Sequence, residues 1–99
     1  MAFSNPGLAM SILFQATTGR PIVLSKGFND TWALQCNGVH FIQDPGNKQE
    51  VAAVENVVNE LADLGLLRAE GWQGANRPIF LTEEGYTFCQ QILQSVKKQ

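Results

Sequence analysis

The chain has little charge, few cysteines and no long apolar run, and each shortage excludes a class of protein. Charged residues make up only 16% of the 99 residues, while hydrophobic residues reach 44%, which is typical of a folded globular chain rather than a disordered one. Two cysteines are too few for a disulfide-stapled scaffold. The longest apolar stretches, 9–14 and 64–67, are too short to span a bilayer. The length predicts one domain, 1–99.

Positive charge is scarce as well. Seven Lys and Arg residues against nine Asp and Glu residues give a formal net charge of −2, which argues against a domain built chiefly to neutralise phosphates. Because the first basic residue is Arg20, the N-terminus lacks the charged start of a signal peptide. We expect the cysteines to be small, buried and reduced, and the protein to be cytoplasmic with no membrane partner.

The first half of the chain predicts a helix followed by strands. Asn5 is suited to cap a helix that has Pro6 at its first position and ends before Gly19. A β-rich run over 22–24 and an alternating run over 32–36 then predict two strands of a hairpin, with a turn over 27–30. A second turn at Asn37-Gly38 leaves open a three-stranded meander that ends near Gln43.

The second half gives the clearest periodicity. Gly65 ends a long helix whose apolar stripe predicts burial along one face. A strand over 66–72, a loop over 73–76 and a strand over 78–81 follow, with Pro78 expected at an edge or a bulge because it cannot donate to a ladder. Thr82 begins a final helix with an apolar face. The stripe of the long helix is Val51, Val54, Val57, Val58, Leu61 and Leu64, and the face of the final helix includes Tyr86, Cys89, Leu93 and Val96.

The phrases Leu61-Ala62-Asp63-Leu64-Gly65-Leu66-Leu67 and Phe80-Leu81-Thr82-Glu83-Glu84-Gly85-Tyr86 resemble the helix–wing–helix signature of bacterial winged-helix regulators. The whole chain is similar to a module of uncharacterised bacterial proteins that contains a helix, a hairpin, a long helix, a wing and a last helix. The resemblance implies an α+β, winged-helix-like fold: three helices with an N-terminal β-hairpin and a C-terminal wing hairpin. One feature departs from it, since 39–46 is strand-like where a helix-turn-helix needs a short helix.

The outward face of the long helix is acidic. Residues 47–64 hold one base and four acids, a local charge of 1 − 4 = −3. Because these acids would be repelled by DNA phosphates, we interpret this face as exposed to solvent rather than as a DNA-binding surface. Asn56 and Asn59 nevertheless have side chains that can pair with adenine. The wing is the better binding candidate, because basic side chains contact phosphates and tryptophan is common at protein interfaces. The candidate site residues are Arg68, Trp72, Asn76 and Arg77.

No catalytic or metal constellation is found in the sequence. His40 is the only histidine and is expected to face solvent, and Cys36 and Cys89 lack the short spacing of a metal site. We therefore expect no enzyme, no cofactor and no metal. Two readings remain for Phe28 and Trp32: they hold the hairpin against the first helix, which we favour, or they form an exposed contact patch.

We expect a core of apolar residues from all elements and, if the face with Tyr86 and Leu93 is uncovered, a homodimer through the final helix. The preferred function is a protein-interaction or adaptor module that binds an unknown protein partner or itself. The alternative is a DNA-binding transcriptional regulator that contacts DNA through the wing, with binding that is weak and salt-dependent. The expected core is Leu8, Ile12, Leu13, Val54, Val58, Leu61, Leu66, Phe80, Leu81, Cys89, Ile92 and Val96.

Overall fold

The computed structural model describes residues 3–97 and shows three helices and a five-stranded antiparallel sheet, which confirms the α+β class. The order of elements differs from the stated fold, because three strands rather than a two-stranded hairpin precede the long helix; they form the three-stranded meander that the sequence had left open. All five strands belong to one sheet with the strand order β3-β2-β1-β5-β4. The elements are α1 (Pro6–Ala16), β1 (Ile22–Lys26), β2 (Trp32–Cys36), β3 (Val39–His40), α2 (Lys48–Asp63), β4 (Leu67–Ala69), β5 (Asn76–Leu81) and α3 (Glu83–Lys97).

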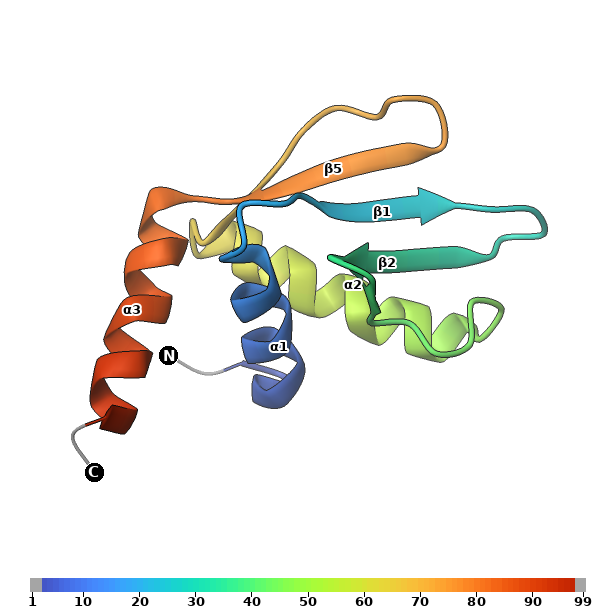
Figure 1. Ribbon diagram of the computed structural model, residues 1–99. Helices are drawn as coiled ribbons and strands as arrows, with labels where there is room; N and C mark the ends of the chain where they lie inside the picture. The colour runs from blue at the N-terminus through green and yellow to red at the C-terminus, as the bar shows by residue number, and fades with distance from the viewer. Residues whose placement is uncertain (1–2, 98–99) are drawn as a thin grey trace.

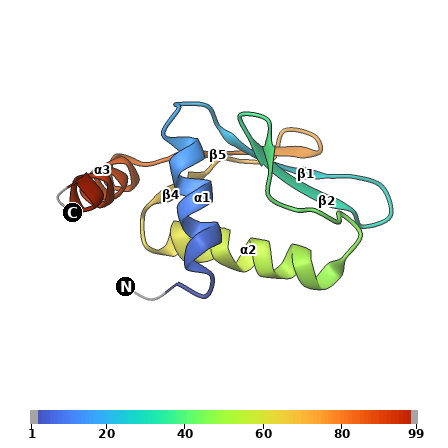
Figure 2. The same cartoon turned by 60° about the horizontal axis from the view of Figure 1, so that its bottom comes forward.

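The helices lie on one side of the sheet and at one of its ends. Figure 1 shows α2 running beneath the strands, while α1 and α3 lie at the end away from the hairpin tips. The turned view in Figure 2 shows α1 crossing α2, with α3 standing apart from both. The molecule is therefore elongated, 47 Å long against 25 and 24 Å across. Among the described residues no helix covers the second face of the sheet, which we call the open face.

Side-chain caps fix where the helices begin. The Asn5 side chain accepts a hydrogen bond from the Leu8 amide at 3.2 Å, as the sequence predicts for α1. Asn47 caps α2 in the same way, accepting from the amides of Gln49 and Glu50 at 3.1 and 3.2 Å. At the other end of α2, Gly65 adopts a φ of 77°, a conformation that glycine reaches without strain, so the chain turns sharply into β4.

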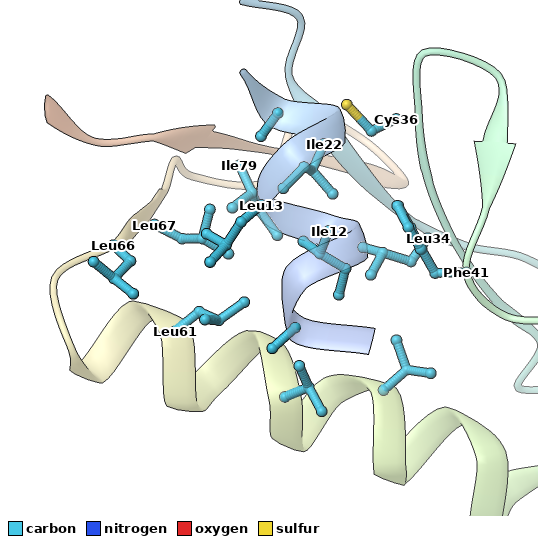
Figure 3. Close-up of a cluster of buried hydrophobic side chains, with 14 of the residues drawn as sticks. Ile12, Leu13, Ile22, Leu34, Cys36, Phe41, Leu61, Leu66, Leu67 and Ile79 are labelled. Atoms are coloured by element: carbon cyan, nitrogen blue, oxygen red, sulfur yellow. The ribbon is translucent and has the colours of Figure 1, made fainter. Parts of the chain in front are cut away.

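The core lies where α1, α2 and the sheet meet. Figure 3 shows Leu61 of α2 and Leu13 of α1 pointing toward the same centre as Ile22 and Ile79 of the sheet. Leu64 does not join them: it is 44% exposed, because α2 ends at Asp63 and the chain then turns away. Of the expected core, Ile12, Leu13, Val54, Leu61, Leu66 and Cys89 are buried, Leu8, Val58, Leu81 and Ile92 are partly buried, and the Val96 side chain lies outside the described residues. The expectation for Phe80 is wrong: alternation along β5 turns Ile79 toward the helices and Phe80 to the open face, beside Arg68.

Pro78 occupies a place that the sequence did not predict. Its strand, β5, is an interior strand between β1 and β4, not an edge, and Pro78 pairs with Val23. Its other neighbour is Glu70, one residue beyond the end of β4, whose amide donates to the Pro78 carbonyl at 2.9 Å. The missing N–H of Pro78 therefore faces the point where the β4 ladder ends, which is how an interior strand accepts a proline.

Candidate functional site

The two hairpin tips lie side by side at one end of the sheet. The Lys26 amide at the end of β1 donates to the Ala75 carbonyl in the β4–β5 loop at 2.9 Å. This pairing brings Trp32 and Trp72 together, with ring centroids 6.0 Å apart and ring planes at 66°, an edge-to-face arrangement. The Lys26 ammonium lies 5.7 Å from the Trp32 ring centroid. Trp72 keeps 45% of its surface exposed, so the pair stands at the surface rather than inside the core.

A pocket of about 210 Å³ opens beside this tryptophan pair, between α2 and the sheet. Most of its wall is apolar and comes from β1, β2 and α2. Three polar side chains also line it: Glu55 and Asn59 from α2, and Arg77 from β5. An apolar pocket with a few convergent polar groups is the usual form of a binding site. We call it the tryptophan pocket. Its apolar lining includes Leu24, Leu34, Val54, Val58, Ala62 and Ala69.

The structure divides the four predicted site residues between the two faces of the sheet. Arg77 pairs with Leu24, and both line the tryptophan pocket together with Trp72. Arg68 and Asn76 lie on the open face, because strand residues two apart share a face and Arg68 pairs with Phe80. Arg68 and Asn76 are thus separated by the sheet from Trp72 and Arg77, and the four do not form one surface.

Arg68 is an exposed residue that already has partners. Its guanidinium makes an ion pair with Glu70 at 3.1 Å and lies 5.8 Å from the Phe80 ring centroid. Its side chain is 66% exposed, so the ion pair is of the weak surface kind, and the neighbouring carboxylate offsets the charge that a phosphate would meet. Asn76, the other predicted residue on this face, accepts a hydrogen bond from the Ser25 hydroxyl at 2.7 Å.

Arg77 has a structural task that the sequence analysis missed. Its Nε donates to the Glu70 carbonyl at 2.8 Å. In a regular ladder that carbonyl would accept from the amide of residue 78, which is a proline and has none. The guanidinium thus replaces the missing backbone donor and is held at the edge of the tryptophan pocket. Among the described residues it makes no ion pair of its own.

Two of the acids on α2 hold other parts of the chain. The Glu50 carboxylate accepts from the amides of Gln43 and Asp44 at 2.6 and 2.9 Å, which fastens the loop that enters the helix. The Glu60 carboxylate accepts from the Ser4 amide and hydroxyl at 3.2 and 3.1 Å. The Asn56 amide also donates to the Ser4 hydroxyl, at 3.3 Å. Much of the face expected to be solvated is therefore in contact with the N-terminal segment and the entry loop.

Phe28 lies at the tip of the β1–β2 hairpin and is 92% exposed, so the favoured expectation that it packs on the first helix is wrong. Trp32 packs against Trp72 and the edge of the core instead. The sequence held a signal for this, since Trp32 alternates in phase with Leu34, whose side chain is buried on the helix-covered face. The partner across the gap, Trp72, follows only from the pairing of β1 with β5, which sequence spacing does not reveal.

The remaining chemistry-bearing residues stand apart from the pocket. Cys36 and Cys89 are free and buried, and burial raises the pKa of both thiols above the ordinary value of 9.0, although the nearby Arg20 charge partly opposes this at Cys36. His40 is exposed on β3, as expected. Within residues 3–97 no cluster of three His, Cys, Asp or Glu side chains is placed to hold a metal ion, and no helix has the length and apolarity to cross a membrane.

Comparison of the chain with protein-family models, with curated proteins and with solved structures found no match.

Proposed function

We propose that this chain is a non-enzymatic protein-interaction module whose binding site is the tryptophan pocket. The observation that carries the proposal is the Trp32–Trp72 pair standing half-exposed over an apolar pocket of about 210 Å³. Tryptophan and arginine dominate the energetics of protein interfaces, where an anchor side chain fills a pocket and loses contact with water. Here both residue types meet at one pocket, since Arg77 lies in its wall.

The polar groups of the pocket support recognition of a polypeptide rather than of a purely apolar ligand. Glu55 offers a carboxylate, Arg77 offers the nitrogens that its bond to Glu70 leaves free, and Asn59 offers both a donor and an acceptor. An apolar side chain in the pocket would thus have groups of either sign beside it. The buried, free state of Cys36 and Cys89 supports a cytoplasmic location for the module, where thiols stay reduced.

The arrangement of the elements also supports a winged-helix-like fold as the finer description. In the proposed winged-helix arrangement β1, β5 and β4 are neighbouring strands of the sheet, α1 packs on β5 and α2 packs on β4, and the β4–β5 hairpin is the wing. The β2–β3 hairpin stands between β1 and α2, where the short helix of a helix-turn-helix would be. Without that short helix, α2 lacks the partner that positions a recognition helix. The absence of this short helix favours a protein-interaction module over a DNA-binding regulator.

The test is selection of random peptides displayed on phage against the folded chain. We expect enriched peptides to carry an aromatic or large aliphatic anchor and to lose binding to the Trp72→Ala and Ala62→Phe variants, which open and fill the pocket respectively. Arg68→Ala is the matched control, because Arg68 lies on the open face, and it should bind as the wild type does. If nothing is enriched, or if peptides bind the pocket variants equally well, the proposal is wrong.

The alternative of DNA binding rests on Arg68 and Asn76, which lie exposed on the open face. A gel-shift titration with random duplex at low salt tests it, since phosphate contacts strengthen as salt falls. If the chain binds DNA, the wild type should shift the duplex and Arg68→Ala should not. The interaction proposal predicts no shift for the wild type or for the variant. Arg77 is unsuited to this test because its replacement also removes a hydrogen bond of the sheet.

A further inference from the structure

Phe28 is presented rigidly at the far end of the molecule. Its carbonyl accepts from both the amide and the hydroxyl of Thr31, at 3.2 and 2.8 Å, and the Gly27 amide donates to the Thr31 carbonyl at 2.8 Å. Between them, Asn29 and Asp30 both adopt a φ of 58°, the left-handed pair that closes a type I′ turn. A phenylalanine that is 92% exposed on so constrained a turn is an anchor without a partner in its own chain.

The tryptophan pocket has the size and the wall for such an anchor. An apolar cavity of about 150 Å³ is enough to hold a benzene ring, and the pocket measures about 210 Å³. Both features lie toward the same end of the sheet, since the pocket is walled by Trp32 and Trp72, which flank the two hairpin tips. Two copies facing each other at this end can therefore exchange anchors in one symmetric contact.

Charges on the tip and beside the pocket are complementary. Lys26 precedes Phe28 by two residues and Asp30 follows it by two. Glu55 and Arg77 line the pocket that would take the ring. Each sign on the tip thus has an opposite sign beside the pocket, which favours one docking direction and penalises its reverse.

We propose that a second copy of this chain occupies the tryptophan pocket, with Phe28 of each copy inserted into the pocket of the other. The proposal rests on the pocket's being an interaction site and names the partner that fills it. The exposed α3 residues Tyr86 and Leu93 offer a competing surface, but they are 48% and 41% exposed and so are already half covered within their own chain. Within the described part of the chain, only this end of the sheet has both an almost fully exposed aromatic side chain, Phe28, and a cavity of matching size.

Sedimentation equilibrium over a range of concentrations measures the dimer. We expect the wild type to dimerise and Phe28→Ala to raise the dimer dissociation constant at least about 100-fold, because two reciprocal aromatic contacts are lost. Ala62→Phe, which fills the pocket, should do the same, and Trp72→Ala, which removes a half-exposed wall, serves if the filled variant does not fold. The double variant Tyr86→Ser/Leu93→Ser is the matched control and should dimerise as the wild type does.

Mixing identifies the contact directly. Phe28→Ala keeps its pocket and Ala62→Phe keeps its tip, so a mixture of the two monomeric variants should form a one-to-one complex through the single intact contact. A wild type that stays monomeric, a dimer that only the α3 variant disrupts, or variants that do not associate on mixing would each overturn the inference. Selection of peptides on Phe28→Ala keeps the two proposals apart, since peptide binding without dimerisation leaves the interaction module standing and removes only the second copy.

Discussion

The bond between Arg77 and the Glu70 carbonyl leads to a double-mutant test of how β5 accepts a proline. Arg77→Met keeps most of the aliphatic stem but removes the donor at 2.8 Å, leaving the Glu70 carbonyl without the bond that the ladder requires. A half-buried hydrogen bond lost in this way costs about 1–2 kcal/mol. In a chain of this size, a loss of about 1 kcal/mol lowers the melting temperature by about 4–8 °C.

Pro78→Ala restores a backbone N–H at the position facing Glu70. Alone it should cost up to about 1 kcal/mol, because the unfolded chain gains freedom when proline is removed. In the Arg77→Met background it should instead recover most of the loss, since the new amide donates to the carbonyl that Arg77 has left. Urea unfolding of the wild type, both single variants and the double variant gives a coupling energy, expected at about 1 kcal/mol. If the changes in unfolding free energy of the two single variants simply add in the double variant, the Arg77 guanidinium does not replace the missing backbone donor.

Three further predictions follow from other contacts within the chain. A Cβ at Gly85 would collide with the Leu66 carbonyl, so Gly85→Ala should lower the free energy of unfolding by about 1–3 kcal/mol despite alanine's better helix propensity, and a neutral result in urea unfolding would contradict the packing. The buried thiols of Cys36 and Cys89 stay protonated at a pH where those of the unfolded chain ionise, so the free energy of unfolding should fall as pH rises through 9.0. A Cys36→Ala/Cys89→Ala variant should lack that fall. If the variant shows the same pH dependence as the wild type, the thiols are not its cause. Glu50→Gln should cost about 1 kcal/mol and speed hydrogen exchange at the two loop amides that its carboxylate holds, whereas unchanged exchange would show that the loop is fixed otherwise.

Local chemistry made several elements predictable. Asn5 and Pro6 together determine where α1 begins, because a capping side chain and a proline at the first helical position act within one turn. The turn at Asn37-Gly38 followed for the same reason, with both residues at positive φ as a type I′ turn needs. The valine stripe of α2 is buried along most of its length because helical periodicity alone decides which side chains share a face.

Pairing between distant strands was beyond the reach of the sequence. Nothing in the residues 22–26 and 76–81 states that β1 and β5 lie next to each other, yet this pairing makes β5 an interior strand and brings the two hairpin tips together. The wrong predictions for Pro78 and Phe28 both arise because this β1–β5 pairing was not foreseen. An isolated wing hairpin would have placed Pro78 at an edge, and separate hairpins would have left Phe28 and Trp32 free to pack on α1.

The β1–β5 pairing also fixes which residues of the expected wing lie beside the tryptophan pocket. Alternation along β5 places Asn76 on the open face and Arg77 toward α2, so one strand supplies both surfaces. On the open face, Arg68 is ion-paired with Glu70 and lies over the Phe80 ring, and Asn76 is hydrogen-bonded to Ser25. The opposite side combines two tryptophans, a fixed guanidinium and an unfilled apolar volume. Since burial of aromatic surface contributes far more to an interface than a screened surface charge, the side facing α2 is where association is expected to occur.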